Sequence, residues 1–170
     1  KAILVCNPGN PTGTQYSKES MLALGDIARR HDLFLLSDEV YREFCYTDEP
    51  HFSAMQIPGL EQNVILIDSV SKRYNLCGAR IGCIVSHNKD VMAAAMKFAQ
   101  ARLCPPVLGQ MASIGALDTP DEYFDAVKEE YIKRRDFMIE GLNKIEGVFT
   151  PLPMGAFYTI AELPVDDTEN

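Results

Sequence analysis

The stretch "VILIDSVSKRYNLCGARIG" (Val64–Gly82) decides the fold, because a short apolar run passes directly into a set of polar groups. Val64–Ile67 is continuously apolar rather than alternating, which is typical of a strand buried on both faces of a parallel sheet. Hydroxyls, an amine and a guanidinium follow within one short segment. Since ligands of open α/β sheets bind beyond the carboxyl ends of strands, this pattern indicates a binding site there.

Three further apolar runs have the same character and predict strands over residues 2–6, 33–36 and 81–85. A helix is expected between the first two strands, with Ser17 as its N-cap and an apolar face formed by Met21, Leu24, Ile27 and Ala28. Strand, helix and strand at this spacing predict parallel pairing. We therefore expect one sheet with neighbours in chain order and the first three strands parallel. The short connection to the fourth strand leaves that strand's direction open.

The second half of the sequence predicts helices. Asn88 is expected to cap a helix that runs to about Leu103, and a short helix through Leu117 follows the prolines at 105 and 106. The segment 119–122 reads as a capping box, with proline at the first helical position, that opens a long helix ending at Gly147. Residues 155–160 then read as a new strand.

Composition and charge limit the possible functions. The chain has 170 residues and a net charge of −8, which argues against nucleic acid as a partner. No apolar run has the length of a membrane span, so we expect no membrane association. The five cysteines and three histidines show no metal-ligand spacing, which predicts no metal site and a reducing, cytoplasmic compartment. The sequence begins directly before an expected strand and stops just after another, and we therefore expect the chain to be a piece of a longer protein.

Two further loops at strand ends carry candidate polar residues. "NPGNPTG" (residues 7–13) follows the first strand and holds the Asn10 amide on a loop stiffened by prolines. "SDEVY" (residues 37–41) follows the second strand and contributes Asp38 and Tyr41. Taken alone, the first loop reads equally well as a stiff connector, and Asp38 as a helix N-cap.

The third loop, after the strand at 64–67, contributes Ser69, Ser71 and Lys72, with Arg80 shortly beyond. Alone, such a lysine is usually solvated and such an arginine usually lies on the surface. Together with the other loops they would collect at one sheet edge. An amine suits a Schiff base, a carboxylate a pyridine nitrogen, and a serine with an arginine a phosphate, which are the groups of pyridoxal phosphate.

With these stretches in the same order, the chain resembles the class I/II aminotransferases of the fold-type I pyridoxal-phosphate enzymes, and aspartate aminotransferases in particular. The resemblance implies an α/β fold: residues 1–118 as part of the large cofactor-binding domain with a mostly parallel sheet, 119–147 as a long interdomain helix, and 148–170 as the start of the small domain. It also implies pyridoxal 5'-phosphate as cofactor and a homodimer at full length.

The resemblance implies a role for each candidate residue. Lys72 would form the Schiff base and act as the catalytic base. Asp38 would pair with the pyridine nitrogen, and Tyr41 and Asn10 would bond the phenolic oxygen. The phosphate would be held by Ser69 and Arg80, with Ser71 beside it. Catalytic roles are assigned to Lys72, Asp38 and Tyr41.

The resemblance implies amino-group transfer between an amino acid and a 2-oxo acid, with aspartate and 2-oxoglutarate as the expected pair and Arg102 as a candidate cation for an acidic side chain. The glycine-containing phosphate loop and the ring-stacking aromatic of the family are not in this sequence, so the isolated piece is expected to be inactive. Alternatives that share the architecture are a C–S lyase, an aminocyclopropane-carboxylate-synthase-type enzyme, and a non-catalytic domain of a transcriptional regulator.

Overall fold

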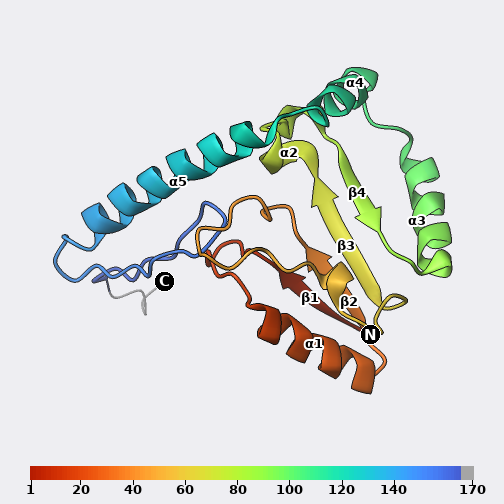
Figure 1. Cartoon of the computed structure of the whole chain (residues 1–170), viewed down its shortest axis with the longest axis horizontal. Coiled ribbons are helices and arrows are strands. Elements are labelled where there is room, and N and C mark those ends of the chain that lie inside the picture. Colours follow the sequence, from red (N-terminus) through yellow and green to blue (C-terminus); the bar gives the residue numbers. More distant parts are fainter. Residues whose placement is uncertain (166–170) are drawn as a thin grey trace.

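The chain folds around a four-stranded sheet in a computed structural model that describes residues 1–165 (Figure 1). The strands lie in chain order: β1 (Ala2–Cys6), β2 (Phe34–Asp38), β3 (Val64–Ser69) and β4 (Gly82–Val85). β1, β2 and β3 are parallel, and β4 is antiparallel to β3. The α/β class, the strand order and the parallel pairing of the first three strands are therefore confirmed.

The register of the parallel strands brings their carboxyl ends level. Cys6 of β1 lies opposite Asp38 of β2, and Asp38 in turn lies opposite Ile67 of β3. Because the three strands run the same way, the loops that follow them leave from one edge of the sheet. That edge carries the three polar segments that the sequence singled out.

Two helices begin directly after the capping residues that the sequence predicts. Ser17 accepts the Ser20 N–H at 3.2 Å ahead of α1 (Lys18–Arg30), and Asn88 accepts the N–H groups of Asp90 and Val91 ahead of α3 (Lys89–Arg102). The remaining helical elements are α2 (Val70–Arg73), α4 (Val107–Ala116), α5 (Asp121–Leu142) and the one-turn 3-10 helices η1 (Ala54–Gln56) and η2 (Cys77–Ala79).

One apolar core lies between α1, the sheet and the segment before β3. Met21 of α1, Leu35 of β2 and Val64 of β3 are almost completely buried there, together with Ile57 and Leu60. The apolar face predicted for α1 makes this core, except that Ile27 at its edge stays exposed. A second cluster joins Tyr41 and Phe44 to Ala156, and so ties the loop after β2 to the end of the chain.

Three sequence predictions about α5 are wrong. Thr119 does not cap α5: its hydroxyl donates to the Ala116 carbonyl at 2.7 Å, and α5 begins at Asp121 after Pro120 without a side-chain cap. The proline is thus the N-cap rather than the first helical residue. The helix ends at Leu142, because Asn143 turns out of it and bonds the backbone of Thr150 with both ends of its amide. Gly147 lies in the following turn at φ +78°.

Residues 155–160 form no strand of the sheet. Ala156 has a positive φ of 56°, which bends the chain there, and the following aromatic side chains pack on Tyr41 rather than beside another strand. An isolated bridge between Cys45 and Gly155 is the sole β pairing of this segment among the described residues. The final five residues of the expected 148–170 unit lie outside the described residues.

In the range 1–165, no helix is both long and apolar enough to cross a membrane. No cluster of three or more histidine, cysteine or acidic side chains suited to a metal ion occurs in the same range.

Candidate active site

Lys72 and Tyr41 meet beyond the carboxyl ends of β2 and β3. The Lys72 Nζ lies 5.9 Å from the centre of the Tyr41 ring and 5.6 Å from the centre of the Phe157 ring. The two rings are themselves perpendicular, with centres 5.2 Å apart. An ammonium or amine held against two aromatic faces keeps its position without a carboxylate partner, and no ion pair to Lys72 occurs within residues 1–165.

The phenol of Tyr41 is buried and tied to a second phenol. Its hydroxyl lies 2.8 Å from the hydroxyl of Tyr158, and the two rings meet edge to face. Burial, then the hydrogen bond and charge of Tyr158, raise the pKa of Tyr41 well above its ordinary value. The Asn10 side chain lies close enough to oppose part of that rise. Tyr41 is therefore a neutral hydroxyl that can donate or accept one directed hydrogen bond.

Cys6, at the end of β1, lies close to both the backbone of Asn10 and the carboxylate of Asp38. Burial raises the pKa of the Cys6 thiol, the backbone N–H of Asn10 opposes that rise, and the charge of Asp38 adds to it. Asp38 lies directly opposite Cys6 in the register, and its Oδ1 accepts the Val40 N–H at 3.2 Å. The turn bond fixes the direction of the carboxylate, although no helix follows, so the helix-cap interpretation of Asp38 does not hold.

Ser69 and Ser71 begin the short helix that carries Lys72. Ser69 accepts the Ser71 N–H at 3.3 Å and caps α2. Arg80 lies apart from this group: it is exposed, has a positive φ of 59°, and its Nη1 donates to the Cys77 carbonyl of its own turn. Contacts within the described residues thus associate Asn10, Asp38, Tyr41 and Lys72, while none joins Arg80 to Ser69. The roles of all seven candidates stay predictions.

The sequence reasoning missed Phe157 and Tyr158, which it placed on a strand. The signal that could have found them is a pair of aromatics directly after Gly155 and Ala156, since a bend at small residues can turn bulky side chains onto a neighbouring loop. Phe157 has Lys72 near its centre and also stacks on Tyr131 of α5 at 5.3 Å. The aromatic wall therefore links the lysine to the long helix.

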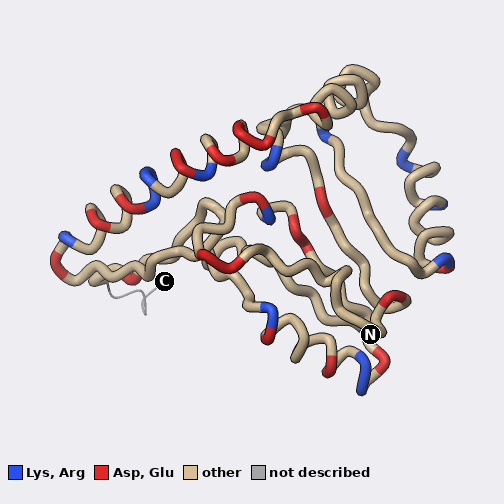
Figure 2. Tube along the Cα trace, viewed as in Figure 1, with Lys and Arg blue, Asp and Glu red and all other residues tan. Residues whose placement is uncertain are grey.

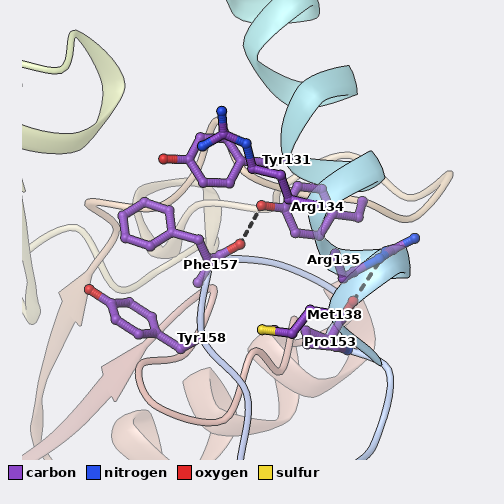
Figure 3. Close-up of a pocket in the computed structure, with 9 residues that line it drawn as sticks. Tyr131, Arg134, Arg135, Met138, Pro153, Phe157 and Tyr158 are labelled. Carbon is purple, nitrogen blue, oxygen red and sulfur yellow. Dashed lines mark hydrogen bonds between the residues drawn. The ribbon is translucent and has the colours of Figure 1, made fainter. Parts of the chain in front are cut away.

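A cavity of about 200 Å³ lies behind this wall, between α5 and residues 153–158 (Figure 3). Tyr131, Met138 and the rings of Phe157 and Tyr158 line it, and Arg135 closes one side by donating to the Pro153 carbonyl at 3.2 Å. The Tyr46 hydroxyl donates to the Ala156 carbonyl at the same place. These bonds hold the bend at Ala156 that presents Phe157 to Lys72.

A buried carboxylate anchors the loop after β2. Glu39 is fully buried, and its oxygens accept the Ser53 hydroxyl at 3.0 Å and the Ala54 N–H at 2.8 Å and pair with His51 at 2.9 Å. Burial opposes ionisation, but the bonds from His51, Ala54 and Ser53 together hold the pKa of Glu39 below its ordinary value. This network fixes the turn from which Tyr41 projects.

Charges of both signs are spread along the outer helices, and Figure 2 shows them alternating along α5. Arg102 lies exposed in the last turn of α3, at a groove of about 930 Å³ between α3 and the sheet that Ser69 also lines. Most of this groove is apolar, with Ile65, Ile67 and Met96 on its walls. No described contact brings Arg102 to Lys72.

Known aminotransferases are similar to this chain over almost its whole length. The family model "Aminotransferase class I and II" matches residues 1–169. A putative aminotransferase, YugH, of Bacillus subtilis is 34% identical over 96% of this chain and 42% of its own length. An aspartate aminotransferase of Rhizobium meliloti is 34% identical over 94% of this chain and 39% of its own length.

Among solved structures, the aspartate aminotransferase from Thermus thermophilus with maleate matches with a TM-score of 0.86 and 32% identity, over 95% of this chain and 42% of that one. The chain thus spans about 40% of the length of the relatives that it matches.

Proposed function

The chain belongs to the aminotransferase class I and II family, whose members use pyridoxal phosphate, and from this premise we propose that the protein transfers amino groups between an amino acid and a 2-oxo acid. The observation that carries the proposal is the position of the Lys72 amine, which lies against two adjacent aromatic rings at the sheet edge where the Asp38 carboxylate also emerges.

The residues at this edge fit the cofactor in their chemistry. Tyr41 and Asn10 present a neutral hydroxyl and an amide, which suit a phenolic oxygen, and the fixed Asp38 carboxylate suits a protonated pyridine nitrogen. Ser69 uses its oxygen as an acceptor toward Ser71, so its O–H is left to donate to a phosphate. In our proposal Ser71 and Arg80 complete the phosphate contacts, for which Arg80 must turn away from the Cys77 carbonyl.

Lys72 is the residue that we propose to act twice. Its Nζ would anchor the cofactor covalently and, once released by substrate, would take the α-proton of the bound amino acid and pass it to the exocyclic carbon of the cofactor. When bound, pyridoxal phosphate supplies an aldehyde for the amino group and a ring that takes up the electrons left behind. Tyr41 and Phe157 support both steps, because their adjacent rings restrict the position of the amine and shield the side of it that they face.

For the substrate we propose aspartate with 2-oxoglutarate as acceptor. Relatives at 32–34% identity are named aspartate aminotransferases, and one of them was solved with maleate, a dicarboxylate. A buried acidic side chain needs a cationic partner. In this chain Arg102 is our candidate for that partner, which requires the α3 groove to adjoin the substrate in the full-length protein.

The test uses full-length protein loaded with pyridoxal phosphate. Lys72→Ala is expected to abolish the visible absorbance of covalently bound cofactor and to lower turnover by at least about 10³-fold, because attachment and proton transfer are lost together. Lys97→Ala, an exposed lysine of α3, is the matched control and should leave both unchanged. Normal turnover of Lys72→Ala would refute the proposal.

Substrate choice is measured with aspartate, phenylalanine and alanine as donors, with wild type and Arg102→Ala side by side. We expect wild type to prefer aspartate and Arg102→Ala to lose about tenfold or more of that preference. A preference for phenylalanine or alanine would refute the acidic substrate. A preference for aspartate that survives the substitution would refute the role of Arg102.

A further inference from the structure

Two of the candidate catalytic residues are followed directly by arginines that share one carboxylate. Arg73 follows Lys72, and its Nη2 lies 2.9 Å from Asp68 Oδ2. Arg42 follows Tyr41, and its Nη2 lies 3.4 Å from the same oxygen. Glu43 completes the group, because its Oε1 lies 3.4 Å from Arg73 Nε and 3.5 Å from Arg42 Nε. We call Arg42, Glu43, Asp68 and Arg73 the Asp68 clamp.

The clamp joins the two segments that carry Lys72 and Tyr41. Asp68 belongs to β3, and its Oδ1 also accepts the Ser69 N–H at 2.8 Å, which fixes the start of α2. α2 is one turn long and has no buried residue, so apolar packing does not hold it in place. The ion pairs connect this turn directly to the segment after β2, in addition to the contact of Lys72 with the Tyr41 ring.

Asp68 and Arg73 are nearly buried, whereas Arg42 and Glu43 at the edge of the clamp are about one-third exposed. The side chains of Asp68 and Arg73 are each 10% exposed, whereas the pairs on α5, Arg134 with Glu130 and Lys144 with Glu140, are more than half exposed. Exposed pairs contribute little to stability, whereas removing one partner of a buried ion pair is strongly destabilising, because it leaves the other charge buried and uncompensated. Apolar residues could stabilise such a turn equally well, so charge at this place favours a role in geometry.

From this arrangement, and resting on the proposed function of Lys72, we infer that the Asp68 clamp positions the Lys72 amine relative to Tyr41. Asp68 and Arg73 are positioning residues: they reach the cofactor site through the backbone of α2 and do not touch the reacting atoms. The clamp holds Nζ at the 5.9 Å separation from the Tyr41 ring. Loss of one partner frees α2 to move, and a misplacement of about 1 Å can slow a reaction by up to about 10²-fold.

The experiment follows attachment of pyridoxal phosphate to full-length apo-protein, by absorbance and by borohydride trapping with mass spectrometry of the modified lysine. Asp68→Asn keeps the side-chain size and an acceptor for the Ser69 N–H, and Arg73→Met keeps most of the apolar stem. Each is expected to slow attachment at Lys72 about tenfold. The double variant should be slowed by clearly less than the product of the two single effects, because all three variants lose the ion pair between Asp68 and Arg73.

Two further variants provide the controls. Glu140→Gln removes a carboxylate from the exposed pair with Lys144 and should remain within about twofold of wild type. Arg73→Lys restores a cation opposite Asp68 but not the two-sided fork of the guanidinium, and should recover part of the rate lost in Arg73→Met. Circular dichroism measures the folded fraction of every variant.

Three outcomes would overturn the clamp: single variants within twofold of wild type, a double variant slowed by the product of the two single effects, or losses that merely track the folded fraction. Failure of the proposed function looks different. In that case wild type itself would show no trapped cofactor at Lys72, or Lys72→Ala would trap as much as wild type.

Discussion

The two ends of the sheet differ sharply in how their apolar residues are used. Beside β1 and β2, α1 buries Met21 and Ala28 completely against Leu35. Beyond β4, α3 has no buried residue, and its Phe98 is 79% exposed (Figure 1). Both helices have clear N-caps, so the difference lies in packing. Capping and composition determine whether a helix forms, whereas a core also needs a facing surface.

The largest expected effect tests this contrast directly. Leu35→Ala should lower the free energy of unfolding by about 3 kcal/mol, because it removes buried methyl groups and leaves a cavity. Phe98→Ala, which removes a larger side chain from the exposed face, should cost less than about 1 kcal/mol. Urea denaturation of the chain measures both. Equal losses would show that the two ends are equally packed.

Two glycines of α4 offer a finer test at the sparsely packed end. A Cβ on Gly109 would lie 2.4 Å from the Ala79 carbonyl oxygen, so Gly109→Ala should cost about 1–3 kcal/mol and displace the turn before Arg80. Gly115 has open space around it, and Gly115→Ala should stabilise by up to about 1 kcal/mol through helix propensity. Thermal unfolding distinguishes the two signs. A neutral Gly109→Ala would mean that α4 does not rest on residues 77–79.

The smallest expected effect is a pH dependence at the well-packed end. Because the folded pKa of Glu39 lies below its ordinary value, its stabilising contribution is present above the unfolded pKa and is lost as pH falls through the folded pKa. Glu39→Gln should therefore flatten the fall in stability below about pH 4.5. At pH 7 it should cost about 1 kcal/mol, since the amide oxygen still accepts from Ala54. Unchanged acid denaturation would argue against this role of Glu39.

The sequence predicted the well-packed end far better than the rest. Continuous apolar runs and the Ser17 cap specified β1, α1, β2 and β3, because both signals are local and agree with the final packing. The strand expected at 155–160 does not form. Aromatic residues are common in strands, so the local pattern predicts a strand even where the aromatic side chains pack on a distant loop instead. Tertiary contacts with Tyr41 decided the outcome there, and no local pattern contains them.

The candidate site divides in the same way. The positions of Lys72, Tyr41 and Asp38 near the strand ends follow from strand direction, which the sequence specifies. Phe157 and the Asp68 clamp depend on side-chain contacts between segments far apart in the chain, such as Arg42 with Asp68. A charge five residues before an arginine, on either side of a strand end, is too common a pattern to indicate such a clamp by itself.

The bond between Tyr41 and Tyr158 has a consequence for how the protein is made. The two residues are 117 positions apart, and Phe157, which borders Lys72, comes one residue earlier than Tyr158. During synthesis from the N-terminus, the parallel strands can pair while the aromatic wall is still inside the ribosome. Lys72 therefore emerges as an open surface lysine and acquires its second ring only near the end of this segment. A ribosome stalled before residue 157 should carry the sheet but leave this amine accessible to acylating reagents.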